Sequence, residues 1–181
     1  VSIDDIYTGN GVSELINLCM SALLDDGDEI LIPSPDYPLW TACATLAGGK
    51  AVHYICDEQS EWYPDIDDMR KKITDRTKAI VIINPNNPTG TYVPIGELEA
   101  FADTLPEDVL LVMDEAYMEF ATEPDCCSMV DYMKAHPEKP ILVLRTFSKY
   151  YAMAGLRVGY ALGSEELIGI MRKCSASWNL N

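Results

Sequence analysis

Basic residues are scarce in this sequence. Among its 181 residues, 13 are Lys or Arg and 29 are Asp or Glu, so the formal net charge is −16. Such a chain repels polyanions, which argues against nucleic acid or an anionic membrane as a partner. The sequence also lacks any apolar run near the roughly 20 residues of a membrane-spanning helix, and no secretory leader opens it. We therefore expect a cytoplasmic protein.

The sequence lacks Cys-x-x-Cys pairs, internal repeats, low-complexity tracts and long linkers. In a cytoplasmic protein its six cysteines are most simply reduced and mostly buried thiols, so neither a disulfide framework nor a metal site is expected. Apolar residues make up 48% of the chain and charged residues 23%, as in an ordinary folded domain. We expect one domain over residues 1–181.

Short apolar runs alternate with segments of helical period along the chain. The expected strands are Ile6–Thr8, Glu29–Ile32, Ala51–Ile55, Ala79–Ile83, Val109–Met113, Ile141–Leu144 and Leu156–Leu162. The expected helices are Val12–Leu24, Tyr37–Ala47, Asp65–Ile73, Ile95–Leu105 and Glu165–Cys174. Strands that alternate with helices in this way predict an α/β fold with a doubly wound sheet.

Polar motifs follow several of these strands. They are Gly9–Ser13, Asn84–Gly90, Asp114–Tyr117 and Arg145–Lys149, with Arg157 a little further along the chain. Ligands of open α/β sheets bind beyond the carboxyl ends of the parallel strands, where these motifs would meet. Each motif alone is a weak signal, but together they predict a binding site.

A glycine-rich turn, Gly9–Gly11, precedes the first expected helix. Backbone N–H groups and the helix dipole at such a turn suit a phosphate, although a plain tight turn explains it equally well. The dinucleotide-binding fingerprint is incomplete, because Glu14 stands where its third glycine belongs. This departure counts against a nicotinamide cofactor.

Three side chains at the strand ends indicate one common ligand. Lys149 is either a surface lysine or an amine that bonds to an aldehyde, given burial or a cationic neighbour that keeps it neutral. Arg157 is either a rim charge or a bidentate grip on a phosphate. Asp114 follows a buried strand and needs a cationic partner, such as a protonated ring nitrogen. Pyridoxal 5′-phosphate (PLP) carries an aldehyde, a phosphate and a ring nitrogen, which are the three groups that these side chains would bind. The three residues therefore favour PLP as the cofactor.

The sequence resembles the fold-type I PLP-dependent aminotransferases of class I/II. The motifs that carry the resemblance, by their order and their intervals, are Gly9–Gly11, Asn86–Gly90, Asp114–Tyr117 and Ser148–Lys149 with Arg157. The resemblance runs through essentially the whole chain. It implies a three-layer α/β/α large domain with a mixed, mostly parallel seven-stranded sheet whose last strand runs antiparallel. It also implies that an N-terminal arm and a C-terminal small domain are missing from this chain. A homodimer that acts on an amino acid and a 2-oxo acid is the implied assembly.

The resemblance also implies roles for single residues. Lys149 forms a Schiff base with the cofactor and then moves a proton, Asp114 pairs with the ring nitrogen, and Tyr117 and Asn87 bond the phenolic oxygen. Tyr37 stacks on the ring, with a plain core aromatic as the alternative. The implied phosphate ligands are Gly11, Val12, Ser13, Thr146, Ser148 and Arg157.

Two branches of the family share the resemblance. Residues from about Tyr7 to Gly90 resemble the alanine-aminotransferase-like branch, and those from about Tyr92 onward resemble the histidinol-phosphate aminotransferases. A divergent member and a hybrid both explain this pattern. An aminotransferase core is the leading hypothesis. The alternatives are a PLP-dependent carbon–sulfur lyase, a non-catalytic module that binds PLP or dimerises, and, last, a dehydrogenase. We expect the chain alone to bind the cofactor weakly and to turn over poorly.

Overall fold

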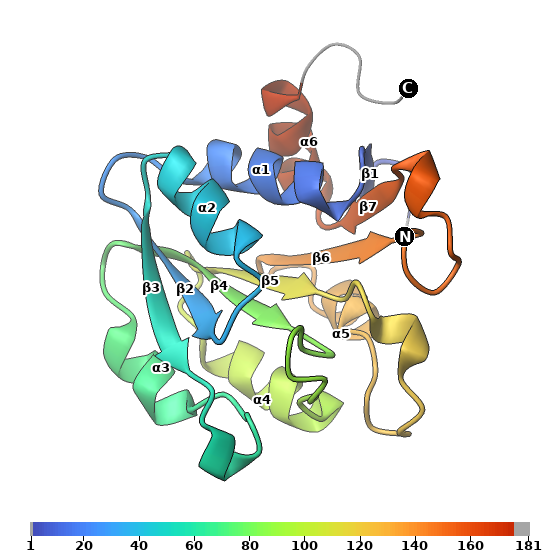
Figure 1. The fold of residues 1–181 in the computed structure, drawn as a ribbon. Helices are drawn as coiled ribbons and strands as arrows, with labels where there is room; N and C mark the ends of the chain where they lie inside the picture. The colour runs from blue at the N-terminus through green and yellow to red at the C-terminus, as the bar shows by residue number, and fades with distance from the viewer. Residues whose placement is uncertain (1, 176–181) are drawn as a thin grey trace.

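A seven-stranded sheet forms the centre of the computed structural model, which describes residues 2–175 (Figure 1). The strands are β1 (Ile6–Gly9), β2 (Glu29–Ser34), β3 (Lys50–Ile55), β4 (Thr77–Ile83), β5 (Leu110–Asp114), β6 (Ile141–Thr146) and β7 (Gly159–Leu162). Their order across the sheet is β1-β7-β6-β5-β4-β2-β3. Strand β7 runs antiparallel to its two neighbours, β6 and β1. The other neighbouring pairs, β3 with β2, β2 with β4, β4 with β5 and β5 with β6, are parallel. The predicted mixed, mostly parallel sheet is confirmed.

Helices cover both faces of the sheet. They are α1 (Val12–Leu23), α2 (Leu39–Leu46), α3 (Ile66–Lys72), α4 (Ile95–Thr104), α5 (Val130–Ala135) and α6 (Glu165–Cys174). In Figure 1, α1, α2 and α6 lie on one face and α3, α4 and α5 on the other. Alternate side chains of a strand point to opposite faces, so Val81 joins the apolar cluster under α1 and α2, while Ile80 and Ile82 join the cluster under α3 and α4. The three-layer architecture follows from this alternation.

Several boundaries differ from the prediction. Strand β2 continues through Pro33, which still aligns with Tyr54 of β3 although pairing with β4 has ended before it. Helix α2 begins after Pro38, so Tyr37 lies in the preceding turn. Strand β7 begins at Gly159 rather than at Leu156, because Arg157 has a left-handed φ of 51° that no strand accommodates. Helix α5 was not predicted.

Short 3₁₀ helices occupy three loops: η1 (Glu58–Ser60), η2 (Met118–Phe120) and η3 (Ala154–Leu156). The last two follow β5 and β6 and carry the chain past the carboxyl ends of these strands. The predicted domain limits of 1 and 181 lie outside the described residues. No helix within residues 2–175 combines the length and apolar character needed to cross a membrane. All six cysteines are free, four buried and two exposed.

Candidate active site

A cavity of about 230 Å³ lies at the carboxyl ends of β4, β5 and β6. Its lining residues are Val12, Ser13, Tyr37, Ile83, Asn87, Asp114, Ala116, Tyr117, Thr146, Ser148, Lys149, Ala154 and Arg157. The structure thus brings together every site residue predicted from the sequence except Gly11. That glycine lies just outside the lining, where an added Cβ would be 2.6 Å from Arg157 Nη2. Sequence reasoning missed Ile83, Ala116 and Ala154, whose apolar side chains carry no chemical signal.

Asp114 ends β5 and is buried, with 3% of its surface exposed. Its Oδ2 accepts a hydrogen bond from Trp40 Nε1 at 3.0 Å, and its Oδ1 accepts one from the Ala116 N–H at 3.2 Å. Burial raises the pKa of Asp114 to about 6, and these two hydrogen bonds act in the opposite direction. Sequence reasoning also missed Trp40, whose only signal was a large aromatic with a polar N–H at the start of an expected helix.

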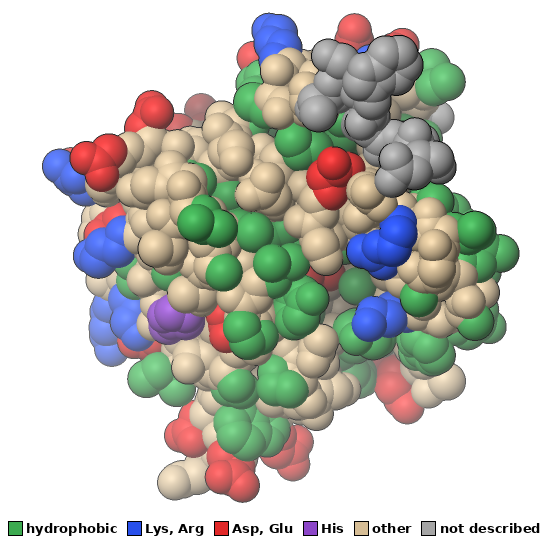
Figure 2. Space-filling model, turned by 45° about the horizontal axis from the view of Figure 1, so that its top comes forward, with side chains coloured by type: hydrophobic (Ala, Val, Ile, Leu, Met, Phe, Trp, Pro, Cys, Tyr) green, Lys and Arg blue, Asp and Glu red, His purple; other side chains and the backbone are tan. Residues whose placement is uncertain are grey.

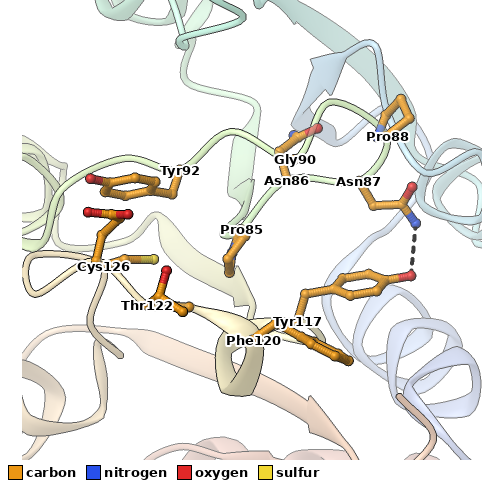
Figure 3. Close-up of a pocket in the computed structure, with 12 residues that line it drawn as sticks. Pro85, Asn86, Asn87, Pro88, Gly90, Tyr92, Tyr117, Phe120, Thr122 and Cys126 are labelled. Carbon is orange, nitrogen blue, oxygen red and sulfur yellow. Dashed lines mark hydrogen bonds between the residues drawn. The ribbon is translucent and has the colours of Figure 1, made fainter. Parts of the chain in front are cut away.

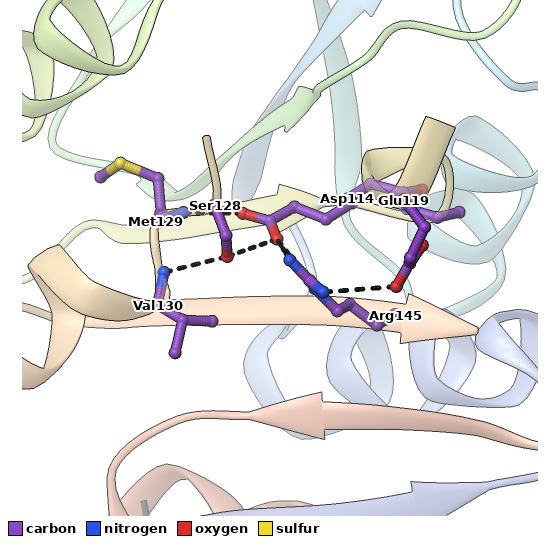
Figure 4. A network of polar contacts seen from close by, with 8 residues as sticks. Asp114, Glu119, Ser128, Met129, Val130 and Arg145 are labelled. Carbon is purple, nitrogen blue, oxygen red and sulfur yellow. Dashed lines mark hydrogen bonds and ion pairs between the residues drawn. The ribbon is translucent and has the colours of Figure 1, made fainter. Parts of the chain in front are cut away.

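An ion pair between the partly buried Arg145 and the buried Glu115 lies beside Asp114. Figure 4 shows Arg145 of β6 between two acidic side chains from the segment that follows β5. Its Nη2 is 2.9 Å from Glu115 Oε2, and its Nη1 is 3.3 Å from Glu119 Oε1. Glu115 accepts two further bonds, from the Ser128 hydroxyl at 2.7 Å and the Met129 N–H at 2.8 Å. Because Asp114 and Thr146 directly adjoin Glu115 and Arg145 in the chain, this network fixes the ends of β5 and β6 relative to each other.

Opposing effects act on the protonation of this pair. Burial raises the pKa of Glu115, while the Arg145 charge and the hydrogen bonds that Glu115 accepts lower it. Burial alone would lower the pKa of Arg145, but the Glu115 carboxylate raises it by more. A fully buried carboxylate with this many donors is held as one half of an ion pair.

The start of α1 forms another wall of the cavity. Gly11 has a φ of 78°, in the left-handed region that favours glycine, and no side chain caps the helix there. The first N–H groups of a helix lack internal partners and suit an anion. Arg157 Nη2 donates to the Asn10 carbonyl at 3.5 Å, which holds the guanidinium beside this turn. Thr146 Oγ1, at the end of β6, accepts the Ser148 N–H at 3.0 Å, and both residues line the cavity.

Lys149 follows β6, and its Nζ lies 5.4 Å from the centre of the Tyr117 ring. The sequence predicts that either burial or a cationic neighbour would keep this amine neutral. Lys149 is exposed, so burial is not met. A cationic residue, Arg157, lines the same cavity. Asn87 Nδ2 donates to the Tyr117 hydroxyl at 3.5 Å. Tyr37 lines the cavity and is 39% exposed, so the alternative reading of Tyr37 as a core aromatic is wrong.

A second cavity, of about 570 Å³, adjoins the first and shares Asn87 and Tyr117 with it (Figure 3). The hydrogen bond between Asn87 and Tyr117, drawn in Figure 3, thus joins two residues that line both cavities. The larger cavity contains neither the amine nor the buried carboxylate. The smaller cavity holds the reactive groups and is therefore the candidate site of the chemistry, although the second cavity has the greater volume.

Comparison with known proteins identifies the family. The family described as Aminotransferase class I and II matches residues 2–181. This chain belongs to that family. Aminotransferases of class I and II use PLP, so the predicted family and type of cofactor agree with the match. Membership also removes the dehydrogenase alternative.

Relatives of this aminotransferase chain come from both predicted branches. It is 48% identical over 164 residues to the glutamate-pyruvate aminotransferase AlaA of Escherichia coli K12, covering 88% of this chain and 39% of the relative. It is 39% identical over 182 residues to histidinol-phosphate aminotransferase 2 of Carboxydothermus hydrogenoformans, covering 100% of this chain and 49% of the relative. The chain therefore spans half or less of the length of these curated relatives.

A solved structure shows the same similarity in three dimensions. The putative histidinol-phosphate aminotransferase of Erwinia carotovora atroseptica is 31% identical to this chain with a TM-score of 0.92. The match covers 100% of this chain and 52% of that structure. The fold described above is thus shared with that solved structure.

Proposed function

We propose that this chain is the cofactor-binding core of an aminotransferase, which moves an amino group between an amino acid and a 2-oxo acid. The proposal rests on one observation: Lys149, Asp114 and Arg157 line a single cavity. An aldehyde requires an amine, a protonated ring nitrogen requires a carboxylate, and a phosphate requires cationic and N–H donors. The residues of this cavity therefore fit PLP.

The surroundings of Asp114 support this fit. Within residues 2–175, neither its hydrogen bonds nor the charges that shift its pKa include a cation. A buried carboxylate without a cation is unfavourable, and a protonated ring nitrogen from a ligand would relieve it. The charge of Asp114 is thus available to a ligand in the cavity.

The cavity residues then divide the tasks around the cofactor. PLP supplies an electron sink that stabilises the charge left when the substrate's α-carbon loses a proton. Asp114 would hold a proton on the ring nitrogen. Lys149 Nζ would hold the cofactor at its aldehyde carbon, with the carbonyl oxygen released as water, and once released by the substrate's amine it would move the proton at the α-carbon. Asn87 and Tyr117 donate hydrogen bonds to the phenolic oxygen, and Tyr37 covers one face of the ring.

The phosphate is held at the start of α1. The N–H groups of Val12 and Ser13 lie in the first turn of α1 and suit an anion, whereas the Gly11 N–H already donates to the Gly9 carbonyl at 2.8 Å. Arg157 adds a fork of donors beside this turn. The hydroxyls of Thr146 and Ser148 complete the set. This end would anchor the cofactor without taking part in the chemistry.

The substrates and the assembly form part of the same proposal. Glutamate with pyruvate is the first pair to test, because relatives in both curated and structural comparisons act as alanine or glutamate-pyruvate aminotransferases. We further propose a cytoplasmic homodimer, in which this chain is the large domain and the small domain is contributed by sequence outside it. The six free thiols suit a reducing compartment.

The experiment adds PLP to the 181-residue chain and to the Lys149→Ala and Lys71→Ala variants. Lys71 is an exposed lysine of α3 that is not part of the cavity lining, and it serves as the matched control. We expect a visible absorbance band in the wild-type chain and in Lys71→Ala, absent in Lys149→Ala. Borohydride should fix the cofactor on Lys149, as peptide mass spectrometry would show.

Attachment to another lysine, or an unchanged band in Lys149→Ala, would refute the assignment of Lys149. The reaction class is tested separately with glutamate and pyruvate on the complete protein that contains this chain. Formation of alanine supports the aminotransferase. Release of ammonia from a cysteine derivative without an amino acceptor would instead identify a carbon–sulfur lyase.

A further inference from the structure

Trp40 contacts the candidate active site through Asp114, although it does not line the cavity itself. It lies in the first turn of α2 and is fully buried. Its indole Nε1 donates to Asp114 Oδ2 at 3.0 Å, a contact between residues 74 positions apart in the sequence. It is the only side chain within residues 2–175 for which a hydrogen bond to Asp114 is found.

The chemistry of the indole matters here. It is a donor only and does not ionise, so it can neither take a proton from Asp114 nor pair with its charge. It occupies one oxygen of the carboxylate, and the Ala116 N–H occupies the other at 3.2 Å. With one donor on each oxygen, the plane of the carboxylate is fixed. The remaining lone pairs stay free for a ligand.

We propose that Trp40 is a positioning residue, whose indole N–H sets the direction in which the Asp114 carboxylate faces the cavity. The inference rests on the proposed function, because the group that Asp114 would meet is the ring nitrogen of PLP. Trp40 itself touches no reacting atom. Its effect passes entirely through Asp114.

The backbone supports the same coupling. The Trp40 N–H donates to the Tyr37 carbonyl at 3.0 Å, so one turn of chain connects the residue proposed to cover the ring with the residue that orients Asp114. The hydrogen bond from Trp40 also opposes the upward effect of burial on the pKa of Asp114. The indole N–H of Trp40 thus affects both the orientation and the ionisation of the Asp114 carboxylate.

The first test uses the cofactor-free chain and follows protonation by NMR. We expect the indole N–H resonance of Trp40 to shift with pH as Asp114 titrates, and to lose this shift in Asp114→Asn. In Trp40→Phe, the pKa of the Asp114 carboxyl should rise by about one unit, as expected for loss of one charge-assisted hydrogen bond. The control is Trp62→Phe, which alters an indole outside the cavity lining and should leave the pKa of Asp114 unchanged.

The indole titration needs no variant at position 40 to fold, so an unstable Trp40→Phe leaves the test decisive. An indole resonance that ignores the ionisation of Asp114 would overturn the proposal. So would a folded Trp40→Phe variant with the wild-type carboxyl pKa. Neither measurement involves PLP, so each outcome stands even if the proposed function fails.

The second test compares PLP affinity in a double-mutant cycle. Trp40→Phe should weaken binding about tenfold in the wild-type background and have little effect in Asp114→Asn, because its action passes through the carboxylate. An equal loss in both backgrounds would show that Trp40 acts by packing alone and would refute the positioning role. A wild-type chain that binds no PLP would count against the proposed function and leave the NMR result to decide on Trp40.

Discussion

Asp114 is the residue at which folding and function are most opposed. An isolated Asp carboxyl titrates at about 3.8, whereas burial raises the pKa of Asp114 to about 6. The folded chain therefore binds more protons than the unfolded chain between these two pH values. Stability that is present below pH 4 is lost as the pH rises to about 6, and it stays lost above that pH. A charge-neutral residue at this position should not show this loss.

We predict that Asp114→Asn gains stability relative to the wild type as the pH rises from 4 to 7, while it weakens PLP binding. Both carboxylate oxygens accept N–H donors, so the amide leaves one donor facing its NH2 group, a cost that is the same at both pH values. The pKa change of about 2 units corresponds to an upper limit of about 3 kcal/mol at pH 7, falling to almost nothing at pH 4. Urea unfolding of both chains at these two pH values measures the difference. A stability difference between the two chains that stays the same from pH 4 to pH 7 would show that Asp114 already has a favourable partner in the folded chain.

The site could be predicted in part at the scale of residues. Asp114, Lys149 and Arg157 carry unusual chemistry directly after strands, and the parallel sheet alone brings such positions together. Trp40 could not be found in this way, because its helix crosses to Asp114 only in three dimensions and an indole in an apolar stripe is ordinary core. The exposure of Lys149 could not be predicted either, since it depends on the path of the segment between β6 and β7, which includes the unpredicted turn at Arg157.

At the scale of elements, β7 is packed directly against the start of α1. A Cβ added at Gly159 would lie 2.8 Å from both the Gly11 carbonyl carbon and the Val12 nitrogen. These contacts are to backbone, which cannot rotate out of the way as a long side chain can. Gly159 thus permits the close approach that puts the proposed phosphate turn beside the sheet.

We predict that Gly159→Ala pushes this turn away from the sheet. It should lower the free energy of unfolding by about 1–3 kcal/mol and weaken PLP binding, because the N–H groups of the turn and Arg157 separate. Urea unfolding and a PLP titration measure the two effects. Gly169→Ala is the matched control: nothing lies within 4 Å of an added Cβ in α6, so stability should stay the same or rise by about 1 kcal/mol. Equal PLP affinity in both variants would contradict the close-packing argument.

Most elements could be predicted because the strands of a parallel sheet are buried on both faces and read as apolar runs. β4 is the clearest case, with burial over nearly its whole length. The failures have local causes. Helix α5 has only six residues, too few for a helical period to show, and the strand expected from Leu156 is interrupted by η3 and the left-handed Arg157. Such turns are fixed by tertiary contacts rather than by residue preference.

At the scale of the whole molecule, the candidate site opens toward solvent. Ser13, Tyr37, Lys149 and Arg157 are all exposed although they line the cavity. Next to them, large apolar side chains of the segment between β6 and β7 are exposed as well: Tyr150, Tyr151, Met153 and Leu156. Figure 2 shows apolar side chains gathered on the right-hand side of the molecule, over this segment. Apolar exposure of this kind is typical of a surface that another part of an assembly covers.

We predict that the 181-residue chain by itself binds PLP at least tenfold more weakly than a complete relative such as AlaA of Escherichia coli, a difference of about 1.4 kcal/mol. Water reaches Lys149 and Arg157 from the open side, so their contacts with the cofactor compete with solvent. Transamination of glutamate with pyruvate should be slower still, because it also requires a positioned substrate. Absorbance titration and alanine formation, measured side by side on both proteins, provide the comparison. Equal affinity and rate would show that residues 1–181 already enclose a complete active site, and would remove the reason to place a small domain over the exposed rim.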